Sequence, residues 1–257
     1  MQNIVFIEDR YAPGQLSVLT EAHLKSKFKD INIIRLSGFQ NVIEASLNLK
    51  AYMDTFPDHT IFFALANLKV NTKSGLLFFE YGKQHIILPD NGAIGYLYNV
   101  DLYSTDVFRI DSGYFIDYSM LWQTLVLITE AVWNNKISTI SVKTNDFKRL
   151  RLTSPQVRIN GFNSNLLFFT ESGSAVCDLR KEDFYEKLQN FSSYKIIVKE
   201  KLLELDSVQA FPMEKAFGDP YAIFNQYGHL EVGLVNSDLK STFRLNDSLT
   251  VKIDFYE

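Results

Sequence analysis

The sequence predicts an α/β fold in two domains: an N-terminal, mainly parallel α/β sheet domain and a smaller C-terminal antiparallel, barrel-like β domain. Strand-like and helical patterns alternate through the first half of the chain, whereas short strand-like runs dominate the second half. The run 61–66 is apolar throughout, as a strand covered on both faces must be. We expect domains at 1–150 and 157–257, with a connection in 137–158.

The order of elements in the first half indicates the parallel sheet. An alternation of strands and helices places the helices on both faces of parallel strands. After this alternating part, the residues at 80–83 predict a hairpin-like turn between two strands. In order, the expected elements are strand 3–7, helix 13–29, strand 31–36, helix 42–53, and strands 61–66, 76–79 and 85–88.

The second half has weaker periodicity. A helix at 118–133 precedes the basic segment 137–158, which we interpret as a solvated connection. Asp178 is a candidate cap for a helix at 181–191. The expected strands are 166–169, 194–198, 229–235 and 249–255.

Composition limits the possible partners. The 26 basic residues do not exceed the 30 acidic ones, so no basic excess attracts nucleic acid or anionic lipid. No run of apolar residues is long enough to span a bilayer, so we expect no membrane partner. The single cysteine cannot form an internal disulfide, and residues 1–7 do not resemble a secretion signal. We therefore expect a cytoplasmic protein.

Common catalytic motifs are missing from the sequence. The four histidines are scattered without metal-ligand spacing, so we expect no metal site. Cys177 lies in a predicted strand, where a small core residue is a better interpretation than a nucleophile. The glycine-rich nucleotide motifs and the serine nucleophile motif are absent.

The stretch 84–95 is a candidate binding edge. Its apolar run ends at Pro89, and Asp90, Asn91 and Gly92 then supply residues typical of turns. Ligands of open α/β sheets bind at the carboxyl ends of strands, so a polar loop leaving a buried strand can carry binding residues. An ordinary strand-to-turn exit explains the same residues.

Five segments, in order along nearly the whole chain, carry a family resemblance: Phe6-Ile7-Glu8-Asp9, Phe56-Pro57-Asp58-His59-Thr60-Ile61, Leu88-Pro89-Asp90-Asn91-Gly92, Gly173-Ser174-Ala175-Val176-Cys177-Asp178-Leu179 and Gly228-His229-Leu230-Glu231-Val232-Gly233-Leu234-Val235-Asn236. Together they resemble the S-adenosylmethionine hydroxide adenosyltransferases, relatives of the fluorinase and chlorinase enzymes. The resemblance implies a homotrimer in which adenosyl ligands bind where the first domain of one subunit faces the second domain of a neighbour. It implies S-adenosylmethionine as substrate or ligand and no further cofactor.

The resemblance also implies ligand-binding residues. Asp9 matches the aspartate that binds the ribose, although a turn or capping carboxylate after a strand is an equally good interpretation. Thr170, Ser172 and Ser174 stand where the family has an aspartate, an aromatic residue and an asparagine. Thr170 and Ser174 can still form hydrogen bonds, but Ser172 cannot stack on adenine. The remaining candidates for ligand binding are Thr72, Asp90, Asn91 and Asn236.

The residues that activate water differ from the family pattern. Members that use water position it with an aspartate, an arginine and a histidine, and the matching positions here are Asn67, Ser74 and Tyr114. These three are the candidate catalytic positions. Asn67 and Ser74 are neutral, so the charges of the family's aspartate and arginine are both missing here. Orientation of water by Asn67, Thr72 and Tyr114 could leave some activity.

Three hypotheses follow. The chain is an active adenosyltransferase in which Lys69 or Lys73 replaces the arginine, a protein that binds a nucleoside-like ligand without turnover, or a trimeric scaffold whose pocket is filled by side chains. Because Asn67 cannot accept a proton, we expect hydrolysis of S-adenosylmethionine to be weak or absent.

Overall fold

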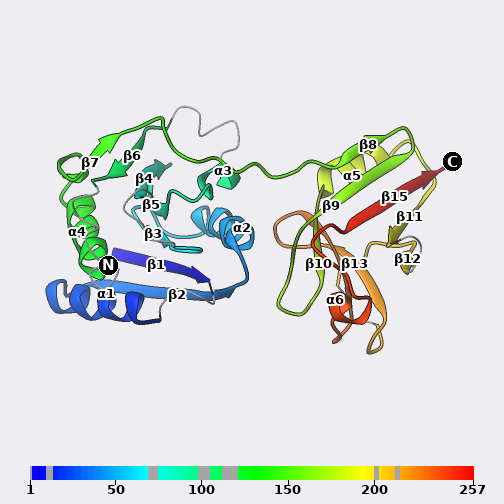
Figure 1. Ribbon diagram of the computed structural model, residues 1–257, viewed down its shortest axis with the longest axis horizontal. Coiled ribbons are helices and arrows are strands. Elements are labelled where there is room, and N and C mark those ends of the chain that lie inside the picture. Colours follow the sequence, from blue (N-terminus) through cyan, green and yellow to red (C-terminus); the bar gives the residue numbers. More distant parts are fainter. Residues whose placement is uncertain are drawn as a thin grey trace. The chain divides into compact units, whose positions relative to one another are not determined.

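The chain divides into two compact units, Met1–Arg151 and Leu152–Glu257 (Figure 1). The first contains a mixed α/β sheet and the second an antiparallel, barrel-like sheet, which confirms the predicted fold class. The computed structural model describes residues 2–9, 14–68, 75–97, 105–111, 121–199, 203–211 and 215–257.

The first sheet has seven strands within the described ranges, in the order β2-β1-β3-β5-β4-β6-β7. One half is parallel and consists of β2 (Ile31–Phe39), β1 (Gln2–Asp9), β3 (Ile61–Ala64) and β5 (Gln84–Pro89). The predicted hairpin at 80–83 reverses the chain direction, so the other half is antiparallel: β4 (Leu76–Tyr81), β6 (Val107–Ile110) and β7 (Ser141–Lys143).

Helices cover both faces of this sheet (Figure 1). Side chains alternate along a strand, so Ile4 and Phe6 of β1 face one helical layer, whereas Val5 and Ile7 face the other. The first layer is α1 (Gly14–Lys27) with α4 (Leu121–Trp133), and the second is α2 (Val42–Met53) with α3 (Ile94–Leu97). In the described part of the chain no helix is long and apolar enough to cross a membrane.

The segment 137–158 is more ordered than the predicted connection. It contains the 3-10 helix η4 (Ile137–Thr139), strand β7 and strand β8 (Gln156–Arg158). Since β7 pairs with β6 and β8 pairs with β9, only Ile140 and residues 144–155 of this segment lie outside regular elements. Elements of three residues are too short to show periodicity, which is why the sequence did not reveal them.

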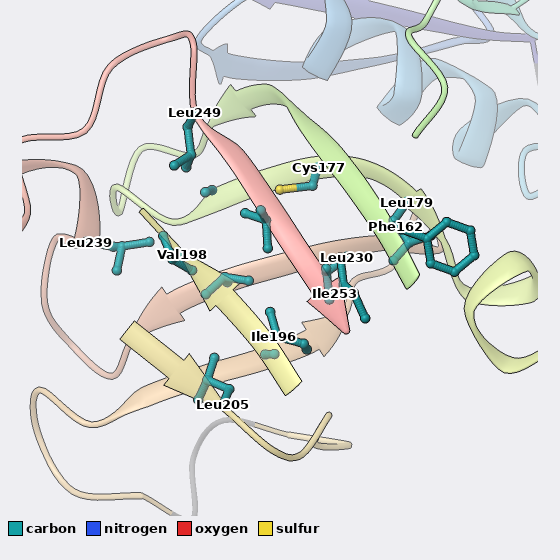
Figure 2. Packing of buried hydrophobic residues seen from close by; sticks show 14 of the residues in the cluster. Phe162, Cys177, Leu179, Ile196, Val198, Leu205, Leu230, Leu239, Leu249 and Ile253 are labelled. Carbon is teal, nitrogen blue, oxygen red and sulfur yellow. The ribbon is translucent and has the colours of Figure 1, made fainter. Parts of the chain in front are cut away.

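The second unit is an almost closed sheet. Gln209, which follows β12, forms a bridge to Ile223 of β13, so the two outer strands of the sheet approach each other. Figure 2 shows the side chains of Cys177, Leu230 and Ile253 packed between strands of this sheet. The strand order is β12 (Leu203–Leu205), β11 (Ser193–Val198), β15 (Thr250–Tyr256), β9 (Gly161–Phe169), β10 (Ala175–Arg180), β14 (His229–Leu234) and β13 (Pro220–Phe224).

The predicted helix at 181–191 is confirmed as α5 (Lys181–Leu188), but Asp178 does not cap it. Strand β10 continues to Arg180, which is the N-cap residue, so Asp178 lies inside the strand and is buried. Its Oδ1 accepts hydrogen bonds from Ser164 Oγ and from the backbone N–H of Asn165, both at 2.8 Å. The Asp178 carboxylate therefore ties β10 to β9.

We predict that Phe63→Ala lowers the free energy of unfolding of the first unit by about 3–5 kcal/mol, because the ring is fully buried. Phe63 also stacks on Phe6, with 5.2 Å between ring centroids. Both tryptophans lie in α4, so their fluorescence during urea unfolding reports on this unit. The exposed control Val142→Ala is expected to change the value by less than about 0.5 kcal/mol. An equal effect of both substitutions contradicts the central position of β3.

Candidate functional site

Three residues of the predicted site meet at the carboxyl ends of adjacent parallel strands. Asp9 ends β1, Asn67 follows β3 and Asn91 follows β5. The backbone N–H of Asn67 donates to Asp9 Oδ2 at 2.5 Å, and Asn91 Nδ2 donates to the backbone oxygen of Ala66 at 2.8 Å. The predicted binding edge of the sheet is therefore one hydrogen-bonded arrangement.

The backbone at Asn67 has a left-handed conformation, with φ of 50°. Asparagine tolerates this conformation better than most residues, and here it directs the Asn67 N–H toward Asp9. Asn91 supports the same turn through its second contact, 3.4 Å from Nδ2 to the backbone oxygen of Asn67. The side chain of Asn67 is exposed and neutral, whereas Asp9 is 8% exposed.

Asp90 has a structural role within the first unit. Its carboxylate lies 2.9 Å from Arg109 Nη1 and accepts the backbone N–H of Lys148 at 2.8 Å. These contacts join the exit of β5 to β6 and to the chain after β7. Both carboxylate oxygens thus already have protein partners, as expected for an ordered strand exit.

The second unit contains a pocket of about 680 Å³. Ser172 and Asn236, two of the expected ligand-binding residues, line it together with Lys215 and Tyr221. Thr170 and Ser174 lie beside Ser172: Ser172 Oγ is 2.9 Å from Thr170 Oγ1 and 3.4 Å from Ser174 Oγ. The four candidates of this unit therefore gather at one pocket.

One aromatic residue that lines the pocket, Tyr221, was not predicted. Tyr221 lines the pocket, and its hydroxyl lies 2.8 Å from Ser174 Oγ. Phe217 is 77% exposed on the loop after Lys215, and the next residue, Gly218, donates its N–H to the backbone oxygen of Val235 in the pocket wall. Phe217 thus lies on the loop next to the pocket wall, outside the residues that line the pocket.

Comparison with known families adds one match. Residues 10–121 match the model of the SAM hydroxide adenosyltransferase N-terminal domain. The chain carries a domain of this family.

Two solved structures share the fold of the whole chain. One is an uncharacterized conserved protein from Thermotoga maritima, with a TM-score of 0.76, 14% identity, and coverage of 99% of this chain and 100% of the other. The second is a conserved hypothetical protein from Thermus thermophilus, with a TM-score of 0.71, 16% identity, and coverage of 98% and 100%. No curated protein matches the chain. At these identities the two structures show a common fold for the adenosyltransferase-family domain and the unit after it.

Several candidates in the adenosyltransferase-family domain lie outside the described residues. They are Thr72, Ser74 and Tyr114, together with Lys69 and Lys73. Among the described residues, no group of three or more His, Cys, Asp or Glu side chains could hold a metal ion. Cys177 is fully buried in the second unit, and burial raises the pKa of its thiol above the ordinary range, which fits a core residue and not a nucleophile.

Glu8 is the most unusual ionisable group near Asp9. It is 6% exposed, and its Oε1 has no hydrogen-bond partner among the residues that the structure describes. Burial raises the pKa of the Glu8 carboxyl, which outweighs the opposing effects of a hydrogen bond with Ser17 and of the charge on Arg35; the nearby charge of Asp9 raises the pKa further. The folded first unit therefore keeps the Glu8 proton to a higher pH than the unfolded chain does.

We predict that Glu8→Gln stabilises the first unit at pH 8 and has little effect near pH 4. The pKa of Glu8 is higher in the folded than in the unfolded chain, so the unfolded chain releases the proton first as pH rises. The stability of the wild type therefore falls as pH rises above the ordinary glutamate value of 4.5 and through the folded pKa. Urea unfolding followed by tryptophan fluorescence measures this. Asp30→Asn, at an exposed carboxylate, is the control. A gain that is independent of pH contradicts the assignment.

Proposed function

We propose that this chain binds an adenosyl ligand, S-adenosylmethionine or its adenosine product, and hydrolyses S-adenosylmethionine very slowly or not at all. One observation carries the proposal: Asp9 is fixed at the carboxyl edge of the sheet by the N–H of Asn67, while the Asn67 side chain beside it is a neutral amide. A carboxylate suited to ribose is thus kept, and the group suited to water activation is replaced.

The proposal that the chain binds an adenosyl ligand rests on Asp9 in the first unit and on the pocket in the second. One carboxylate can accept hydrogen bonds from two neighbouring ribose hydroxyls, and Asp9 stands at the position that the resemblance assigns to that contact. The pocket of about 680 Å³ lies within the range of small-molecule sites. A pocket of that size also favours binding over the scaffold hypothesis, in which side chains fill the space.

The slow-turnover half rests on missing charges. A positioned acid or base typically contributes roughly 10²- to 10⁴-fold to a rate, and Asn67 cannot take a proton. Ser74 and Tyr114, which stand at the positions of the family's arginine and histidine, supply no fixed positive charge to hold a hydroxide. Lys69 or Lys73 replacing the arginine is the alternative that preserves activity.

Assembly and location are part of the same proposal. The ligand site implied by the resemblance is shared between neighbouring subunits, so we propose that the chain works as a homotrimer. A cytoplasmic location is proposed from the single cysteine, which can form no internal disulfide.

We predict that Asp9→Asn weakens adenosine binding by about 10- to 100-fold, the value of one to two hydrogen bonds to a charged group. The asparagine oxygen can still accept the Asn67 N–H, so the turn is expected to persist. Isothermal titration calorimetry measures the dissociation constant, with Asp30→Asn as the exposed control. Unchanged binding means that Asp9 is a turn carboxylate and that the ribose lies elsewhere.

We also predict turnover of S-adenosylmethionine far below about 1 s⁻¹, the lower end of common enzyme rates. The assay follows adenosine, 5′-chloroadenosine and methionine by chromatography, with and without chloride. Asn67→Asp restores a carboxylate and is expected to raise the rate, whereas Asn67→Ala is not. Wild-type turnover near 1 s⁻¹ contradicts the proposal, and substitution of Lys69 and Lys73 by Met then locates the missing charge.

A further inference from the structure

A chain of hydroxyl groups runs from the pocket wall to a carboxylate in the second unit. Thr170 Oγ1 lies 2.9 Å from Ser172 Oγ, which lies 3.4 Å from Ser174 Oγ. Ser174 Oγ lies 2.8 Å from Tyr221 Oη, and Tyr221 Oη donates to Glu231 Oε1 at 3.1 Å. Ser172 and Tyr221 both line the pocket. The direction of the hydrogen bonds along these hydroxyl groups therefore determines whether the pocket wall offers a donor or an acceptor to a ligand.

The carboxylate end fixes the direction of the chain. Asn225 Oδ1 accepts the backbone N–H groups of Tyr227 at 3.1 Å and His229 at 3.2 Å. Its amide nitrogen therefore faces Glu231 and donates to Oε2 at 3.3 Å. Glu231 is an acceptor only, so the Tyr221 hydroxyl must donate to it.

Each hydroxyl further along must then donate in the same direction. The hydrogen of Tyr221 is used by Glu231, so Ser174 donates to Tyr221, and the contact between Ser172 and Ser174 requires Ser172 to donate. Ser174 contributes its backbone N–H to Thr170 Oγ1 at 3.0 Å, which leaves the Thr170 hydroxyl hydrogen for Ser172. All the hydroxyl hydrogens thus point toward Glu231.

The arrangement is built into the fold. Tyr221 is 7% exposed, and burial raises the pKa of its hydroxyl to about 12, so it is a neutral phenol with a hydrogen to donate. A Cβ at Gly233 would lie 2.5 Å from Ser174 Oγ and from Tyr221 Oη. Any larger residue at position 233 therefore displaces the hydroxyl pair, and only glycine accommodates it.

We propose that this polarised chain makes the pocket wall at Ser172 a hydrogen-bond acceptor, and that the pocket therefore selects a ligand that presents an amino group there. The inference rests on the proposed adenosyl ligand and deepens it by assigning specificity to Tyr221 and Glu231. The acidic residues Glu171 and Asp238 line the same pocket, and both carboxylate oxygens of Asp238 accept hydrogen bonds from Ser241. Lys215 lines it too, with its ammonium donating to the backbone oxygen of Pro220 at 2.7 Å.

The test compares adenosine with inosine, in which a carbonyl oxygen replaces the amino group, by isothermal titration calorimetry. The wild type is expected to prefer adenosine by about 10-fold, the value of one well-placed hydrogen bond. Tyr221→Phe breaks the chain and is expected to reduce the preference to within about 3-fold. Tyr185→Phe makes the same change at a partly exposed tyrosine of α5, outside the pocket lining, and is expected to keep the wild-type ratio.

Glu231→Gln gives the sharpest result. The glutamine oxygen pairs with the Asn225 amide, so its NH₂ group faces Tyr221 and donates to it. Tyr221 then donates to Ser174 and Ser174 to Ser172, which frees the Ser172 hydrogen for a carbonyl oxygen of the ligand, and inosine is expected to bind more tightly than adenosine. Lys215→Met is expected to change both affinities by the same factor, because its ammonium is not part of the chain.

The outcomes separate the two proposals. If the wild type binds both nucleosides equally, or if Tyr221→Phe and Glu231→Gln keep the wild-type ratio with unchanged circular dichroism, the specificity inference is overturned while the adenosyl-ligand proposal holds. If the wild type binds neither nucleoside, nor S-adenosylmethionine, the proposed function fails and the specificity inference fails with it.

Discussion

The hydrogen bonds that join Asp9, Asn67 and Asn91 hold together the polar edge of the sheet in the first unit. They cross three adjacent parallel strands at the edge where the strands end. The bond to Asp9 depends on the backbone conformation of Asn67, which must be left-handed to direct its N–H toward the carboxylate. Both faces of β1 and β3 are buried, and this packing holds the strand ends in place. The geometry of the site therefore depends on the packing of the core.

The two units use polar groups differently. In the first, the backbone N–H of Asn67 holds the carboxylate of Asp9, a group that suits recognition of paired hydroxyls. In the second, side-chain hydroxyls form a chain that ends on Glu231, which suits discrimination between donors and acceptors. Binding and selection of a ligand are the functions that we propose for these two arrangements.

The sequence predicted the features that depend on local pattern. The alternation of strands and helices, the turn after Pro89 and the helix after Arg180 follow from periodicity and turn residues, and all are present. Features set by contacts distant in sequence were missed. Asp178 binds β9 instead of capping α5, Asp90 pairs with Arg109, and Tyr221 looks like an ordinary strand residue until its hydroxyl meets Ser174. No local signal encodes such partners.

Native mass spectrometry after incubation with S-adenosylmethionine tests the central claim most directly. The protein is mixed with one equivalent of the compound, freed of excess by gel filtration, and measured at intervals alongside Asp9→Asn. Retention of one intact S-adenosylmethionine per chain over many hours, and its loss in Asp9→Asn, is the predicted result. An empty wild-type chain, or rapid conversion of the bound compound to adenosine and methionine, contradicts binding without efficient turnover.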